Sequence, residues 1–292
     1  MSDDMNNIAV IGAGMAGLAA ARHLADAGRQ VVVFEKSRGT GGRLATRRRS
    51  EAMFDHGAPI AQGCSDFDAT MCALSADRIG AGWRGSPGMS ALLKPWVDGL
   101  DLRHEQQVTA VDHLRDGWHL TIADHGGAGP FDAVVIAIPA PQAQKLMPHP
   151  ALEKVMMRPA WSLLAIWPEL TLPKPSAPFE VIVDMSSHPN GTVGAIVAHC
   201  NEAFSRSHLE DTPDQICSLL VQRLQQLTGC TVMPRFAQAH RWRYARTTDP
   251  LGQPFIDAGY GCFIGGDWAL GSHAGDAWRS GLALAEALTA GG

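Results

Sequence analysis

Three glycines and a later acid are the residues of this chain whose types and spacing most clearly indicate a chemistry. Gly12, Gly14 and Gly17 follow the apolar residues 8–11, and Glu35 lies about 20 residues further on, after a second apolar run. The glycines permit a tight turn and a close approach to a pyrophosphate, whose charge the following helix N-terminus attracts. A carboxylate there can hold ribose hydroxyls. The pattern predicts a dinucleotide site, with NAD or FAD favoured over NADP.

The segment that follows Glu35 favours FAD over NAD. Residues 36–46 form a basic, glycine-rich stretch that contains Gly42 and Arg43. A flexible loop at this position can cover the phosphates and ribityl chain of a larger dinucleotide, which simple NAD dehydrogenases do not need. The arginines at 47–49 follow at once, and we expect them to belong to a solvated basic loop.

Composition limits the class of protein. The chain has 292 residues, 46% hydrophobic and 18% charged, with a net charge of −5, which argues against a general nucleic-acid partner. The six cysteines contain no CxxC pair and no Cys/His cluster with zinc spacing, so we expect no metal and reduced thiols in the cytoplasm. The acidic N-terminus does not resemble a signal peptide, and no apolar run of about 20 residues predicts a membrane span.

The elements that must position these residues predict an α/β fold, with a Rossmann-type FAD-binding domain and a second, mainly antiparallel β substrate domain. Apolar runs at 131–139 and 261–267 indicate buried parallel strands, and 275–290 indicates a final helix. Between them we expect strands near 162–167, 179–184, 193–199 and 236–244, with a helix near 213–227. The predicted FAD-binding domain comprises 1–58, 88–150 and 246–292, and the predicted substrate domain comprises 59–87 and 151–245.

Several motifs in this order resemble the FAD-dependent amine-oxidase superfamily, and more specifically its renalase-like branch. The segments that carry this resemblance are 35–47, 54–58, 87–90, 240–245 and 266–268. The sequence departs from the branch after Ala58, because residues 59–64 lack the aromatic, Thr-containing stretch usual near the flavin. This departure leaves the substrate open.

The resemblance implies a non-covalent FAD. The three glycines would line its pyrophosphate, Glu35 would hold the adenosine ribose, and Val108 would meet the adenine through its backbone. Arg43 would lie beside the phosphates and ribityl chain, Asp267 would bind the ribityl or pyrophosphate region, and N–H groups at 274–277 would face the flavin O2. The full predicted cofactor set is Gly12, Gly14, Met15, Ala16, Gly17, Glu35, Lys36, Ser37, Gly42, Arg43, Leu44, His56, Gly57, Ala58, Val108, Gly266, Asp267, Ala274, Gly275 and Ala277.

The resemblance also implies an activity. Bacterial renalases oxidise aberrant dihydronicotinamide isomers of NAD(P)H, with hydride transfer to flavin N5 and reoxidation by O2 to give hydrogen peroxide. We therefore expect a small reduced donor of this kind as substrate. The alternatives are a small-amine oxidase or another flavin dehydrogenase, and a flavin-binding protein without turnover.

Three residues are candidates for contact with the donor: Trp268, His273 and Arg243. Trp268 could stack beside the flavin or pack in the core, His273 could contact substrate or cap the last helix, and Arg243 could hold phosphates or pair with an acid. No general base stands out, and hydride transfer from a dihydropyridine needs none. The chain has only two tyrosines, so an aromatic cage for an amine is hard to build, which favours the dihydronicotinamide donor.

Overall fold

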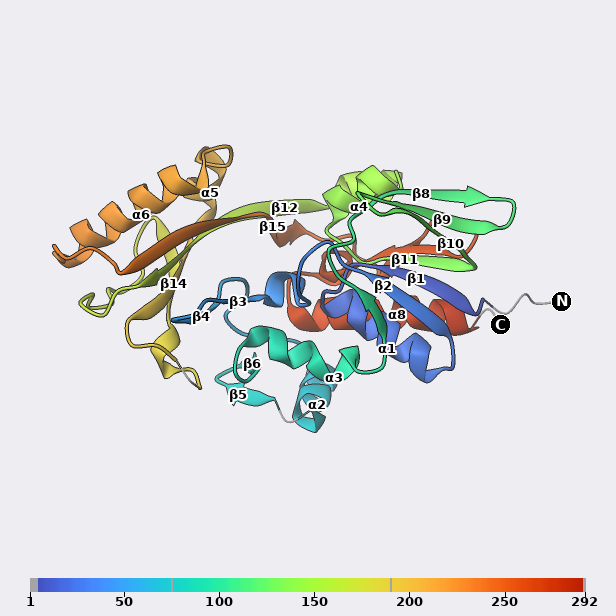
Figure 1. The fold of residues 1–292 in the computed structure, drawn as a ribbon, viewed down its shortest axis with the longest axis horizontal. Coiled ribbons are helices and arrows are strands. Elements are labelled where there is room, and N and C mark those ends of the chain that lie inside the picture. The colour runs from blue at the N-terminus through green and yellow to red at the C-terminus, as the bar shows by residue number, and fades with distance from the viewer. Residues whose placement is uncertain (1–4, 75, 190, 291–292) are drawn as a thin grey trace.

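The computed structural model describes residues 5–74, 76–189 and 191–290. The chain forms an elongated molecule with a lobe at either end, and both termini lie at the end of one lobe (Figure 1). Strands β12 (Met156–Ile166) and β15 (Phe236–Asp249) run from this lobe into the other. In the described part of the chain, no helix has the length and apolar character needed to cross a membrane.

A six-stranded sheet forms the core of the first lobe. Its order is β16-β17-β11-β1-β2-β7, and all neighbouring pairs are parallel except the β16–β17 edge. The central strands β1 and β11 are apolar at successive positions because both faces of the sheet are covered. Their bounds are β1 Asn7–Ile11, β2 Gln30–Phe34, β7 Asp101–Arg103, β11 Ala133–Ile136, β16 Phe255–Asp257 and β17 Cys262–Gly265.

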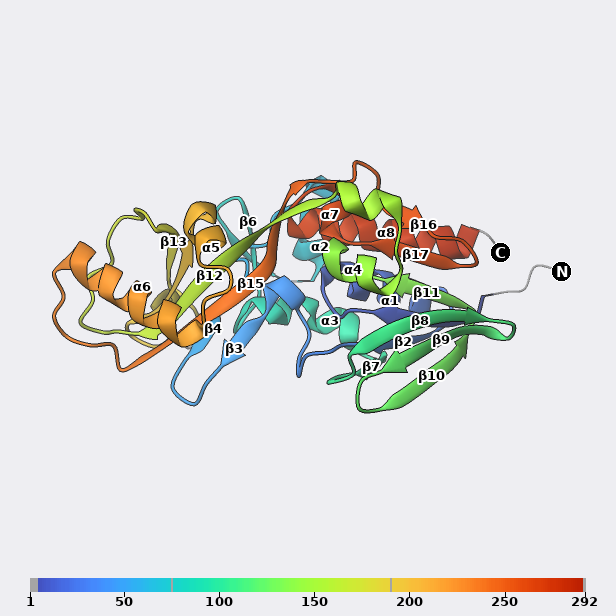
Figure 2. The same ribbon diagram turned by 90° about the horizontal axis from the view of Figure 1, so that it is seen from above.

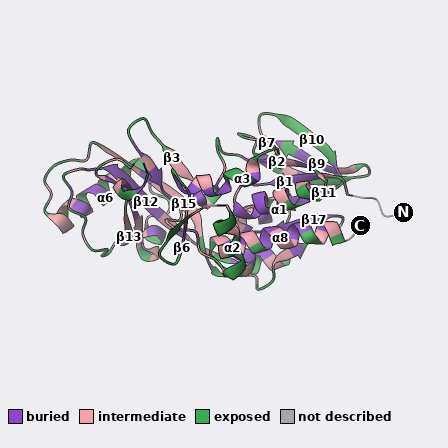
Figure 3. Cartoon of the chain, turned by 90° about the horizontal axis from the view of Figure 1, so that it is seen from below, coloured by how far each residue is buried: buried purple, intermediate pink, exposed green. Residues whose placement is uncertain are grey.

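Alternate residues of β1 show how the two faces are covered. Ile8 and Val10 pack with helices α1 (Met15–Asp26) and α8 (Ala274–Ala290), whereas Ala9 and Ile11 pack on the other side. That side carries the meander β8 (Val108–Leu114), β9 (Gly117–Ile122) and β10 (Gly126–Phe131), together with α4 (Ala140–Leu146), η3 (Pro150–Lys154) and α7 (Asp267–Leu270). Buried positions therefore concentrate along the strands and the inner faces of the helices (Figure 3).

The second lobe is an antiparallel sheet in the order β13-β14-β12-β15. Trp161 and Leu163 on one face pack against α6 (Pro213–Thr228), which begins at a capping box of Thr212 and Gln215. The opposite face packs on the hairpin β3–β4, which lies beside this sheet in Figure 2. The remaining bounds in this lobe are β3 Thr46–Arg48, β4 Met53–Asp55, β13 Phe179–Asp184, η4 Met185–Ser187, β14 Ala195–Cys200 and α5 Glu202–Ser207.

The structure confirms the fold class, and it places one predicted segment in the other lobe. The segment 59–87, which we predicted to belong to the substrate domain, packs through Phe67, Met71 and Trp83 into the core that contains α1 and α8. Sequence periodicity missed this segment because its elements are short. They are α2 Ser65–Ala73, β5 Asp77–Ile79 and β6 Gly82–Arg84, and they are followed by η2 Met89–Leu93 and α3 Lys94–Val97.

Candidate functional site

A cavity of about 1930 Å³ lies between the two lobes and is lined by residues of both. Typical small-molecule sites occupy roughly 300–1,000 Å³, so this space can take a dinucleotide and a second molecule. Every residue of the predicted cofactor set except Gly17 and Gly275 lines it. Segments far apart in the sequence therefore meet at one site.

The glycine turn leaves the start of α1 open to the cavity. Gly12 has φ +104°, and a Cβ on Gly17 would lie 1.9 Å from the Gly12 carbonyl oxygen, so these two positions hold helix and strand together. A Cβ on Gly14 would instead meet no protein atom within 4 Å. No side chain caps α1 at Gly14, and no acid lies in its first turn. The N-terminal N–H groups and helix dipole are thus available to a phosphate, as the predicted pyrophosphate site requires.

Glu35 is held firmly at the edge of the cavity. Its side chain is buried, with Oε2 accepting a hydrogen bond from the Ala13 N–H at 2.9 Å and Oε1 accepting one from the Ser37 N–H at 2.8 Å. Each carboxylate oxygen has a second lone pair, so these bonds orient the group without using up its capacity to accept from ribose hydroxyls.

Arg43 and Asp267 form one ion pair. The guanidinium of Arg43, on η1 (Gly42–Leu44), donates to both Asp267 oxygens, at 2.7 and 2.5 Å. Two parallel charge-assisted bonds fix the second glycine loop to the end of β17. The sequence placed these two residues near the same part of a cofactor, and the structure brings them together at the cavity wall.

Residues 56–58 are held against that loop. The Ala58 N–H donates to the Arg43 carbonyl oxygen at 2.8 Å, and a Cβ on Gly57 would lie 2.0 Å from the same atom. His56, one residue earlier, begins a wall of rings on the side of the second lobe.

His56, His240 and Trp242 form this aromatic wall. The His56 ring centroid lies 4.8 Å from that of His240 and 5.1 Å from that of Trp242, and the latter two are 4.5 Å apart. The Trp242 indole N–H donates to the His56 carbonyl oxygen at 2.8 Å. Burial, then the neighbouring His240 and Arg47, lower the pKa of His56 to about 3, while burial and Arg47 lower the pKa of His240 to about 4. Both imidazoles are therefore neutral at neutral pH.

The start of α8 differs in part from the expectation. The Gly275 N–H donates to the Gln62 carbonyl oxygen at 2.8 Å, and a Cβ on Gly275 would lie 2.4 Å from the Gly63 Cα. The Ala277 N–H donates to the His273 carbonyl oxygen within the helix. The predicted contact of Gly275 with a flavin is therefore corrected, because the chain at 62–63 already occupies its N–H. Ala274 and Ala277 remain at the cavity surface.

The candidate donor residues Trp268 and Arg243 have structural partners of their own. Trp268 is fully buried, and its indole N–H donates to the Ile138 carbonyl oxygen at 2.9 Å, so it packs in the core and does not line the cavity. Arg243 lines the cavity but pairs with Glu210 through two bonds of 2.7 and 2.9 Å. The placement of Trp268 corrects its predicted position beside a flavin.

His273 lies directly before α8 and lines the cavity. Its N–H donates to Asp276 Oδ2 at 3.0 Å, which caps the start of α8, and its ring lies at the surface of the cavity. Trp161 and Trp167 of the second lobe are also fully buried.

Positive charge is concentrated at this cavity. Half of the chain's 24 lysines and arginines line it, whereas the carboxylates among the described lining residues are Glu35, Glu180 and Asp267. The net charge of −5 conceals this asymmetry because the cations come from separate segments. They are Lys36, Arg38, Arg43, Arg47, Arg48, Arg49, Lys94, Lys145, Arg158, Arg241, Arg243 and Arg246.

Comparisons with known proteins agree with this architecture. Residues 69–289 match the family model described as flavin containing amine oxidoreductase, and residues 10–74 match an NAD(P)-binding Rossmann-like domain. Over 53 residues the chain is 49% identical to a 4,4'-diapophytoene desaturase (4,4'-diaponeurosporene-forming) of Staphylococcus haemolyticus (strain JCSC1435). That match covers 18% of this chain and 11% of the desaturase.

Solved structures share the fold over nearly the whole chain. A protein from Exiguobacterium sp. 255-15 described as “Putative protoporphyrinogen oxidase” has a TM-score of 0.73 at 13% identity, covering 96% of this chain and 98% of that one. Cyclohexylamine oxidase from Brevibacterium oxydans IH-35A has a TM-score of 0.67 at 14% identity, covering 97% and 98%. At these identities the similarity establishes the fold.

Proposed function

Because the chain belongs to the flavin-containing amine oxidoreductase family and its cofactor is FAD, we propose that it oxidises an anionic reduced donor of the dihydronicotinamide dinucleotide class. This assigns it to the renalase-like branch. When bound, FAD would supply the redox chemistry: a two-electron oxidation of the donor by hydride transfer, with O2 as the final acceptor, reduced to hydrogen peroxide by the hydride equivalent and one proton from solvent.

The residues present fit such a cofactor. The open space beside Gly14 and the uncapped start of α1 would receive the pyrophosphate, and the oriented carboxylate of Glu35 would hold the adenosine ribose. Gly42 and Arg43 would lie along the phosphates and ribityl chain, with Asp267 keeping the arginine in place. These contacts need no covalent bond to the protein.

The positive charge of the cavity is the observation that carries the choice of donor. The pyrophosphate of FAD offsets only part of the excess of cations over the described carboxylates in its lining. A small alkylamine is a cation at neutral pH and would be repelled from this space, whereas a dinucleotide brings its own phosphates. The charge therefore supports a dihydronicotinamide dinucleotide over an amine.

The aromatic wall supports the same choice. His56 and His240, with pKa values lowered to about 3 and about 4, would offer uncharged rings to a planar donor, and Trp242 adds a larger face. A dihydropyridine becomes a stable aromatic cation when it loses hydride, so no side chain has to remove a proton. Of the two tyrosines, Tyr244 lines the cavity, and Tyr260 stacks on His113 elsewhere.

Anaerobic flavin reduction tests the proposal. Purified, FAD-loaded protein is mixed in separate experiments with the aberrant dihydronicotinamide isomers, ordinary NADH, cyclohexylamine and putrescine, and the flavin absorbance is followed. We expect rapid bleaching with the isomers and return of the oxidised spectrum with hydrogen peroxide when O2 is admitted. Bleaching by amines alone would establish the amine-oxidase alternative, and a flavin that none of these donors reduces would overturn the proposal.

A further inference from the structure

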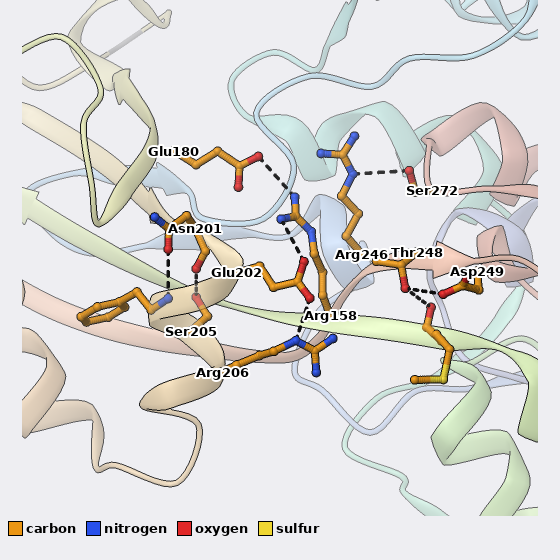
Figure 4. A network of polar contacts seen from close by, with 12 residues as sticks. Arg158, Glu180, Asn201, Glu202, Ser205, Arg206, Arg246, Thr248, Asp249 and Ser272 are labelled. Carbon is orange, nitrogen blue, oxygen red and sulfur yellow. Dashed lines mark hydrogen bonds and ion pairs between the residues drawn. The ribbon is translucent and has the colours of Figure 1, made fainter.

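Two arginines face each other across the strands that join the lobes. Arg158 of β12 and Arg246 of β15 are direct partners in the antiparallel register, and both line the cavity. Their side chains extend to the same side of the two strands (Figure 4). Like charges at directly opposite positions of an antiparallel pair destabilise a sheet, so this arrangement has a cost that packing does not explain.

The local backbone brings this about. The register between β12 and β15 shifts between Arg158 and Ala160, where Pro159 lies. Between these two pairs β12 has only Pro159, whereas β15 has residues 243–245, so the extra residues of the bulge belong to β15. Pro159, opposite the bulge, has no N–H to donate to the ladder, and a bulge redirects the side chains beside it. Arg243 and Arg246 are an odd number of residues apart, so a regular strand would point them to opposite faces, yet both line the cavity.

The charge of the pair is only partly neutralised by the protein. Arg158 lies 3.2 Å from Glu180 and 3.8 Å from Glu202, and Glu202 also binds Arg206 at 2.6 Å. The Nε of Arg246 donates to the Ser272 hydroxyl at 3.4 Å, and within the described chain Arg246 has no carboxylate partner. Figure 4 shows these contacts from close by. An anion between the two guanidinium groups would remove the repulsion.

The arginine pair lies at a distance from the aromatic wall that suits the diphosphate of a dinucleotide donor. Ala160, two residues beyond Arg158 on β12, pairs with Trp242 of the aromatic wall. Two residues of strand correspond to roughly 7 Å, which places the arginine pair a short distance along the cavity from the rings. Resting on the function proposed above, we propose that Arg158 and Arg246 bind the diphosphate of the dinucleotide donor while its ring lies against the wall. Paired guanidinium groups suit phosphate because each can form two parallel bonds to it.

Variants of the two arginines test this subsite with donors that differ only in phosphate content. R246Q and R158Q are compared with wild type in anaerobic flavin reduction by a dinucleotide isomer, by its mononucleotide, and by an N-methyl dihydronicotinamide that lacks phosphate. We expect each variant to raise the apparent Kd for the dinucleotide about tenfold, the effect of one lost charge-assisted contact, with the limiting rate unchanged. The phosphate-free donor should respond equally in all proteins. Equal weakening of that donor, or an unchanged Kd for the dinucleotide, would overturn the subsite.

A second readout is independent of turnover. ADP-ribose and inorganic pyrophosphate are titrated into the FAD-loaded proteins, and binding is measured by calorimetry. We expect wild type to bind ADP-ribose and both variants to bind it about tenfold more weakly, while R246K retains part of the affinity. If the variants bind ADP-ribose as tightly as wild type does, or if wild type does not bind it, the proposed subsite is wrong. This holds even if a dihydronicotinamide donor reduces the flavin. If binding behaves as expected but no dihydronicotinamide reduces the flavin, the proposed function fails and the anion subsite stands.

The matched control is R206Q. Arg206 belongs to the same network through Glu202 but does not line the cavity, so its removal should leave donor and ADP-ribose binding unchanged. FAD content and thermal unfolding of every variant show whether its fold and cofactor site are intact. A loss of FAD in R246Q would mean that this arginine serves the cofactor, which would also overturn the assignment.

Discussion

The two sides of the cavity recognise their ligands by different means. On the nucleotide side, the important atoms are backbone N–H groups at the start of α1 and a carboxylate whose own position is set by backbone donors. On the side of the second lobe, the surface is formed largely by side chains of β12 and β15 together with His56, and it includes neutral rings and arginines. Backbone recognition restricts the sequence, because only glycine fits at the close approaches, whereas a side-chain wall can be built from many sequences on the same sheet.

The predictions that follow test whether this division holds. If it does, substitutions on the nucleotide side reduce FAD content, and substitutions on the other side change the affinity for the donor while FAD stays bound.

The largest effect is expected from E35R. The change removes a buried carboxylate that accepts two backbone hydrogen bonds and would hold the ribose, and it introduces a cation. Loss of the hydrogen bonds that the carboxylate would accept from the ribose hydroxyls predicts FAD binding weaker by on the order of 100-fold or more. The ratio of flavin to protein absorbance after purification measures this. E153R, an exposed charge reversal away from the cavity, is the control, and full FAD content in E35R would contradict the assigned role.

Replacing Trp268 and replacing Trp242 should affect different properties, the first mainly stability and the second mainly donor binding. Trp268 is fully buried, so W268L should lower the free energy of unfolding by about 2–4 kcal/mol, through lost packing and an unpaired Ile138 carbonyl, without changing the donor. Trp242 is half-buried at the cavity, and the His56 carbonyl that it contacts keeps a second donor in the Ser162 hydroxyl. W242L should therefore cost less stability and weaken donor binding about threefold to tenfold.

Denaturant unfolding and anaerobic reduction distinguish the two variants. If W268L bound the donor more weakly than wild type but unfolded with the wild-type free energy, Trp268 would have to contact the donor, which its packing in the core excludes. If W242L left donor binding unchanged, the aromatic wall would not contact the donor.

Gly17 and Gly14 belong to the same glycine turn but have different roles, so replacing each of them separates the fold from FAD binding on the nucleotide side. A Cβ on Gly17 would lie 1.9 Å from the Gly12 carbonyl, so G17A should destabilise the fold by about 1–3 kcal/mol. A Cβ on Gly14 meets only open cavity, so G14A should keep its unfolding midpoint and bind FAD about tenfold more weakly. Thermal unfolding of the FAD-free proteins and FAD titration measure the two effects. A destabilised G14A apoprotein would mean that Gly14 is required by the fold and not by the ligand.

These contrasts explain how much the sequence could predict. The glycine turn, Glu35 and the Gly-Asp pair at 266–267 are short segments whose function depends on local geometry, and their neighbours along the chain place them. The aromatic wall and the arginine pair depend on register between strands that are distant in sequence. Nothing near Arg158 indicates that it pairs with Arg246, because a bulge in β15 opposite Pro159 decides the pairing. Gly275 failed as a flavin contact for a related reason, since a distant segment, 62–63, occupies its N–H.

The smallest expected effect concerns the protonation of three histidines that line the cavity, two of which belong to the aromatic wall. Burial is the largest cause that lowers the pKa values of His56, His199 and His240, to about 3, about 4 and about 4, from an ordinary value of 6.5. Above pH 6.5 both folded and unfolded chains hold these rings neutral. As the pH falls from 6.5 towards 4, the unfolded chain binds protons that the folded protein does not, so the free energy of unfolding decreases, by up to about 1.4 kcal/mol per pH unit for each histidine.

Replacing one of these rings should reduce that slope. H240Q removes a titrating group that lies beside Arg47, so its unfolding midpoint should fall less steeply between pH 6.5 and 4.5 than that of wild type. H125Q, at an exposed histidine that does not line the cavity, is the matched control and should keep the wild-type slope. Equal slopes for H240Q and wild type would mean that His240 binds its proton over the same pH range in the folded protein as in the unfolded chain. The wall would then carry a positive charge once the pH falls below about 6.5, and the contrast between a neutral ring site and a cationic phosphate site would no longer hold at acidic pH.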